Sequence, residues 1–125
     1  MSEEIVYLHL PPESSLPEIV HEPTRVVVII EAKVSAEWQS LVSDWIVSAG
    51  CLYMMAWGIE CTAWDDSVDW ANIEKYGEEP IPDDNFVITT WHSDEKLADV
   101  FWFSKNAAVH PVIDLQRTMF APIEY

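Results

Sequence analysis

The chain has 125 residues, which fits one domain, since domains usually hold roughly 100–200 residues. Half of the residues are hydrophobic and 12% are aromatic, so the chain can bury a core and is not globally disordered. Its 22 acidic residues against 6 basic ones give a net charge of −16, which argues against binding to nucleic acid or to anionic membranes.

The acidic balance has two interpretations. It attracts a basic protein or a cation, or it only keeps a tryptophan-rich surface soluble. The two cysteines, Cys51 and Cys61, fit no zinc or redox spacing, and the amino terminus lacks the features of a secretory signal. No apolar run approaches the ~18 residues of a membrane span. We therefore expect a cytoplasmic protein with free thiols and no membrane partner.

Residues 1–24 differ from the rest of the chain. Residues 5–10 are apolar enough for a short strand, or for an arm that docks on the core. Prolines then interrupt regular structure, because each fixes φ and lacks an amide donor. They are Pro11, Pro12, Pro17 and Pro23. We predict an extended, acidic, proline-rich arm over residues 1–24 and a single α/β domain over residues 25–125.

A strand, a helix and a second strand are predicted next. The β-branched run at residues 25–31 is typical of a central strand covered on both faces. Ser35 suits a helix N-cap, and Gly50 suits the position just after the helix. Between them, apolar residues recur at helical spacing: Trp38, Leu41, Val42, Trp45, Ile46 and Ala49. A second apolar strand at residues 51–57 stops at Gly58, so the three elements form a βαβ unit with parallel strands.

The alternation of helices and strands continues after Gly58. We expect a second helix that begins at Asp65 or Asp66 and ends at Tyr76, since carboxylates are favourable at a helix N-terminus. A polar, turn-rich connection follows this helix. Residues 86–91 then form a third strand, because they are rich in β-branched and aromatic side chains.

Three further segments complete the predicted fold. Ser93 is expected to cap a third helix, residues 112–118 to form a fourth strand, and residues 119–125 to form a short tail. The order βαβαβαβ predicts a three-layer α/β domain with a mainly parallel four-stranded sheet and helices on both faces. Ligands of such sheets bind beyond the carboxyl ends of the strands, so residues near positions 60 and 90 should meet at one rim.

Negative charge is concentrated near that rim. Between Glu60 and Asp99 there are twelve acidic residues against two basic ones, Lys75 and Lys96, and tryptophans are interleaved with them. Aromatic anchors in a charged rim are typical of protein-binding surfaces. We expect a small acidic module that binds a basic protein, such as an immunity protein, an inhibitor or a DNA mimic, with its oligomeric state open. The residues predicted to contact the partner are Trp64, Asp65, Asp66, Asp69, Trp91 and His92.

Two alternatives use the same region, so whether the chain is an enzyme stays open. Asp65, Asp66, Asp69 and His92 can bind a hard cation such as Mg²⁺, which would suit a small metal-assisted hydrolase at the carboxyl ends of the strands. Cys61 and His92 can form a nucleophile pair, although the negative surroundings oppose a thiolate. The chain lacks GxGxxG and GxxxxGK(S/T) loops, so we expect no nucleotide and no other cofactor.

Four segments resemble a small bacterial family of uncharacterised proteins that is marked by WDDSVD and TTWH blocks. The segments are VVVIIEAKVSAEWQSLVSDWIVSAGCLYMMAWG, WDDSVDWANIE, IPDDNFVITTWHSDE and FWFSKNAAVHP, and they cover most of residues 25–118. The resemblance implies a bacterial origin and a single cytosolic domain, and it implies no activity, substrate or cofactor. For a bacterial protein, the expected roles include that of an accessory protein of a defence system.

Overall fold

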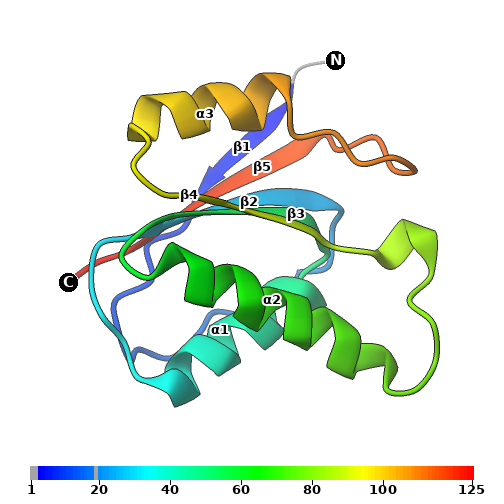
Figure 1. Ribbon diagram of the computed structural model, residues 1–125, viewed down its shortest axis with the longest axis horizontal. Helices are drawn as coiled ribbons and strands as arrows, with labels where there is room; N and C mark the ends of the chain where they lie inside the picture. The colour runs from blue at the N-terminus through cyan, green and yellow to red at the C-terminus, as the bar shows by residue number, and fades with distance from the viewer. Residues whose placement is uncertain (1–2, 19) are drawn as a thin grey trace.

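The computed structural model describes residues 3–18 and 20–125. Its elements follow in the order β1 (Glu4–Tyr7), β2 (Thr24–Ile30), α1 (Ala36–Ser48), β3 (Cys51–Gly58), α2 (Cys61–Tyr76), the 3₁₀ helix η1 (Asp83–Asn85), β4 (Ile88–His92), α3 (Leu97–Asn106) and β5 (Arg117–Ile123) (Figure 1). The strands form one parallel sheet in the order β1-β5-β2-β3-β4. The predicted α/β class with a parallel sheet and three helices is confirmed. The predicted number of four strands is wrong, because the sheet has five.

The sheet is covered by helices on both sides. Figure 1 shows α1 and α2 on one side and α3 on the other. In β2, Val26 and Val28 belong to the core that α1 and α2 cover, whereas Val27 packs with Val100 of α3. A strand whose side chains are buried on both faces needs no alternation of polar residues, which is why β2 reads as a continuous apolar run.

The last strand lies later in the sequence than predicted. Residues 112–116 are irregular because Nδ1 of His110 accepts hydrogen bonds from the backbone N–H groups of Val112 (3.2 Å) and Ile113 (3.1 Å). The expected tail instead forms most of β5, between β1 and β2. Pro122 is tolerated there. Its carbonyl oxygen accepts a hydrogen bond from the Leu10 amide (2.9 Å), and the nitrogen of the same residue points to the same side, so the missing amide hydrogen takes no bond away from the pairing with β2.

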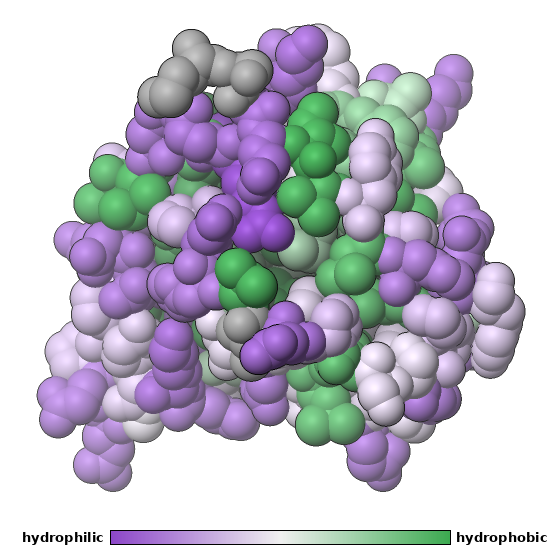
Figure 2. Space-filling model, turned by 180° about the vertical axis from the view of Figure 1, so that it is seen from behind, coloured by the Kyte–Doolittle hydropathy of each residue, from purple (hydrophilic) through white to green (hydrophobic). Residues whose placement is uncertain are grey.

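The amino-terminal segment contributes to the fold in two ways. Residues 4–7 form β1 at the edge of the sheet, which agrees with the first of the two predicted alternatives, a short strand. Further along, the indole N–H groups of Trp38 and Trp45 donate to the backbone oxygens of Ser14 (2.8 Å) and Pro17 (2.9 Å). The proline-rich segment is therefore fastened to α1. Figure 2 shows the back of the molecule, where exposed hydrophobic residues are interspersed with hydrophilic ones rather than gathered in one broad patch.

Helix α1 begins as predicted, with the Ser35 hydroxyl accepting from the Trp38 amide (3.2 Å). Helix α2 begins at Cys61, four residues before Asp65, because Glu60 in the left-handed conformation (φ 54°) starts it without a side-chain cap. Helix α3 begins at Leu97, and Ser93 does not cap it. Strand β4 begins two residues later than predicted. No helix in the described ranges combines the length and the apolar character needed to cross a bilayer.

Candidate functional site

The sheet has a topological switch point between β3 and β4. From the carboxyl end of β3 the chain continues into α2 on one side of the sheet, and from β4 it continues into α3 on the other side (Figure 1). Neighbouring strands whose connections leave to opposite sides create a crevice, which is the usual ligand position in such sheets. An open cleft of about 360 Å³ lies here, and its lining includes Glu60, Cys61, His92, Ser93, Asp94 and Glu95.

The side chains of this cleft are mostly bonded to one another. The Cys61 sulfur lies 3.7 Å from the Ser93 hydroxyl oxygen. The two ring nitrogens of His92 lie 2.9 Å from the Glu95 carboxylate and 2.9 Å from the Thr90 hydroxyl. The buried imidazole also packs edge-on against Phe103 of α3. With both nitrogens bonded elsewhere, His92 has no nitrogen free to activate Cys61, so the predicted nucleophile pair is not assembled.

The Thr90 hydroxyl, the His92 imidazole and the Glu95 carboxylate are hydrogen-bonded in a row. This is the order of groups in the catalytic triad of a hydrolase. Thr90 is not among the residues that line the cleft. A triad needs its nucleophile beside the substrate. We interpret these bonds as the fastening of the connection between β4 and α3.

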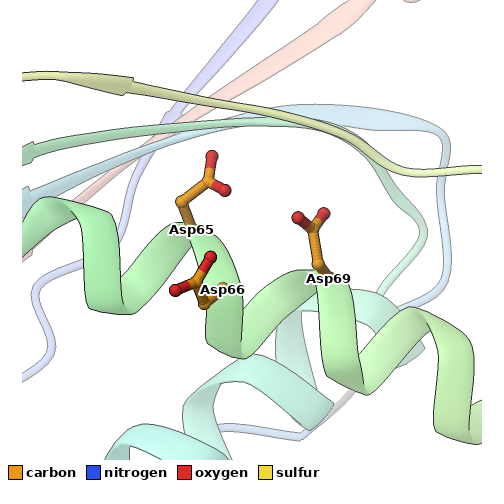
Figure 3. A group of neighbouring side chains, drawn as sticks. All are labelled: Asp65, Asp66 and Asp69. Atoms are coloured by element: carbon orange, nitrogen blue, oxygen red, sulfur yellow. The ribbon is translucent and has the colours of Figure 1, made fainter.

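A second group of polar side chains lies on α2, on the side that faces β4. The Thr89 hydroxyl donates to the Asp69 carboxylate (2.8 Å). Asp65, Asp66 and Asp69 each offer a carboxylate oxygen, and these three oxygens lie within 4.8 Å of one another (Figure 3). We call these three residues the aspartate cluster.

Asp65 is the most constrained member of the aspartate cluster. Only 4% of its surface is exposed, and its Oδ2 atom has no hydrogen-bond partner. Burial raises the pKa of the Asp65 carboxyl, and the charges of Asp69 and Asp66 raise it further. The structure therefore holds a carboxyl group where its charged form is disfavoured.

The six residues predicted to contact a partner separate into three places. Asp65, Asp66 and Asp69 come together, and Trp91 is exposed (54%) on β4, two residues beyond Thr89 and on the same face of the strand. Trp64 is 1% exposed and belongs to the core between the sheet, α1 and α2. His92 points to the opposite face of the sheet, because successive side chains of a strand alternate. It is therefore not a member of the three-residue group that could hold a cation.

Three exposed apolar residues, two of them on α2 and one just before β4, were not among the predicted site residues. They are Trp70 (61% exposed), Ile73 and Phe86. The Asn72 side chain donates to the Asn85 carbonyl (3.2 Å) and accepts from the Val87 amide (3.0 Å), so α2 is fastened beside the start of β4. Helical periodicity from a start at Cys61 would have identified Trp70 and Ile73 as outward-facing. We define the α2–β4 surface as the exposed side chains Asp66, Trp70 and Ile73 of α2 and Trp91 of β4.

Comparison with protein-family models gives a match to a domain of unknown function (DUF7684), which covers residues 5–124. No curated protein and no solved structure matches the chain.

Proposed function

The chain belongs to the DUF7684 family, a domain of unknown function, and we propose that it is an acidic protein-binding module for a basic protein partner. One observation carries the proposal: the α2–β4 surface exposes three large apolar side chains within the most acidic part of the chain. Twelve acidic and two basic residues between Glu60 and Asp99 give that part a charge of −10, out of −16 for the whole chain.

The two components of this surface have separate physical roles. Tryptophan side chains such as Trp70 and Trp91 gain binding energy when a partner covers them, and aromatic residues are enriched among the dominant contacts of interfaces. The surrounding carboxylates accelerate the encounter with a basic protein, and salt weakens this effect. Strand β4 is also the last strand of the sheet order, so its outer edge offers backbone groups to a partner strand.

The proposed cellular role follows from this chemistry and from the resemblance of the WDDSVD and TTWH blocks. We propose a bacterial, cytoplasmic protein that blocks a basic enzyme, as an immunity protein or inhibitor does, or that serves a defence system. The strong acidity supports a protein partner over nucleic acid, whose phosphates would be repelled.

The proposal is tested by capture from bacterial lysate on the immobilised full chain. We expect a basic protein to be retained at about 0.05 M salt and released at about 0.5 M, because salt screens exposed charges. Replacing Trp70 and Trp91 together by alanine should weaken capture by roughly 30-fold or more, the equivalent of one dominant contact. Trp102→Ala is the matched control, since Trp102 is as exposed but lies on α3.

A pair of charge reversals separates a contact surface from simple solvation. Asp66→Lys changes the α2–β4 surface, and Asp44→Lys makes the same change on the exposed side of α1. We expect the first variant to lose the captured protein and the second to keep it. Equal capture by the wild type and by the variants at positions 66, 70 and 91 would show that the α2–β4 surface is not the binding surface.

A further inference from the structure

The Asp65 carboxylate is a buried polar group without a complete set of partners. Its residue is 96% buried, and Oδ2 is shielded from solvent and accepts no hydrogen bond. Buried polar atoms in native proteins are nearly always bonded, because an unpaired one loses its hydration without compensation. An acceptor-only group in this position indicates that something positively charged or protonated completes it.

The surroundings of Asp65 are rich in oxygen and in negative charge. Figure 3 shows the carboxylates of Asp65 and Asp69 extending from α2 towards the sheet, with Asp66 beside them. Thr89 adds a hydroxyl oxygen next to Asp69. Within residues 3–18 and 20–125, neither the ion pairs of Arg25 and Arg117 with glutamates nor the His92–Glu95 contact includes a member of the aspartate cluster. Three carboxylates at this separation repel one another unless a cation or a proton lies between them.

We propose that the aspartate cluster binds one hard divalent cation, of the class of Mg²⁺, Ca²⁺ or Mn²⁺. Such ions take oxygen ligands, and carboxylates are the ligands that hold them most strongly in proteins. The three oxygens within 4.8 Å of one another come from a single helix turn, so the site requires no rearrangement of the fold to assemble. The unpartnered Oδ2 of Asp65 is the group that distinguishes this cluster from the exposed acidic residues elsewhere on the chain. The proposal concerns binding alone and no reaction.

The test is a calorimetric titration of the full chain, freed of metal with EDTA, with CaCl₂, MgCl₂ and MnCl₂ in turn. We expect one saturable ion per chain for at least one of the three cations. Asp65→Asn should bind that cation at least about tenfold more weakly, since one charged ligand is lost at nearly constant volume. Asp84→Asn is the matched control, because Asp84 also lies beside another aspartate, Asp83, but is exposed in η1, and its affinity should equal that of the wild type.

Thermal unfolding provides the second measurement. A cation that binds only the folded chain raises the melting temperature, and the rise should be present in Asp84→Asn and reduced in Asp65→Asn. Asp69→Asn should reduce it as well, which keeps the test valid if one variant folds poorly. Constant high monovalent salt removes the effect of general screening.

Two results would overturn the inference: no saturable binding by the wild type at millimolar cation, or equal affinity in wild type and Asp65→Asn. Either result would mean that Asp65 does not take part in binding a cation. Neither would affect the proposed capture of a basic protein when that assay is run in EDTA, because two of its decisive positions, Trp70 and Trp91, lie outside the aspartate cluster.

Discussion

The most direct test of the local energetics is Asp65→Asn in the absence of divalent cations. An ionised Asp65 leaves one buried oxygen unbonded next to two other carboxylates. The asparagine is neutral, and its amide can donate to the Asp69 carboxylate. Relieving an unsatisfied buried polar group typically stabilises a fold by about 1–3 kcal/mol. We therefore expect Asp65→Asn to be more stable than the wild type by this amount at pH 7, a gain of about 4–12 °C in melting temperature for a chain of this size.

The gain should depend on pH in a defined direction. The pKa of Asp65 is raised in the folded state above its ordinary value of 3.8. A raised carboxyl pKa means that ionisation destabilises the folded chain, so this penalty is absent below pH 3.8 and grows as pH rises through the folded-state pKa. The difference in unfolding free energy between Asp65→Asn and the wild type should accordingly be close to zero near pH 3. It should reach its full size at neutral pH.

Urea unfolding in EDTA between about pH 3 and pH 8 measures this difference, provided that the m-values of the two chains agree. Asp66→Asn is the control on the same helix turn, and because Asp66 is exposed its effect should stay within about 0.5 kcal/mol. If Asp65→Asn lowers the stability at pH 7, or if its effect is the same at pH 3 and pH 7, the assignment of a disfavoured buried charge is wrong.

Two further predictions concern the core and its connections. Gly58 has φ +105°, and an added Cβ would lie 2.1 Å from the Ile30 carbonyl oxygen, so Gly58→Ala should destabilise by at least about 2 kcal/mol in urea unfolding. Gly77→Ala should lose less, because its Cβ meets no atom within 4 Å and only its backbone (φ 59°, ψ −120°) is strained, and equal losses would contradict the steric argument. Burial raises the pKa of the Cys51 thiol to about 12, so alkylation at about pH 8 should leave Cys51 unmodified in the folded chain, as judged by peptide mass spectrometry. Rapid alkylation of Cys51 in the folded chain would contradict this expectation and would show that the start of β3 opens readily.

The sequence predicted the centre of the fold well because burial there is complete. The apolar runs of β2 and β3 have no other stable position than inside a covered parallel sheet, and Ser35 and Gly50 delimit α1 through capping and a positive φ. The last strand begins at Arg117, five residues later than predicted. Its Pro122 is tolerated because the side of this residue without an amide hydrogen faces Leu10 and not β2, which is a tertiary fact that no local pattern contains.

The candidate site was predicted in part for a related reason. The rule that ligands lie at the carboxyl ends of parallel strands correctly gathers Glu60, Cys61, His92 and Ser93 around one cleft. It does not tell which side of the sheet each residue faces. Placing Trp64 on the surface failed because α2 begins at Cys61, and from that start Trp64 shares the inward face with Val68. A start at Asp65 would have left Trp64 outside the helix.

Strand β4 divides the chemistry of this region between its two faces. Thr89 bonds to the aspartate cluster on the α2 side, while Thr90 and His92 bond to each other on the α3 side. The single rim expected from the sequence is therefore two sites that share one strand but no side-chain hydrogen bond among the described residues. Substitutions without shared partners usually have additive effects on stability. A double-mutant cycle between Asp65→Asn and Glu95→Gln should therefore give a coupling below about 0.5 kcal/mol, and a larger value would mean that the sheet transmits strain between its two faces.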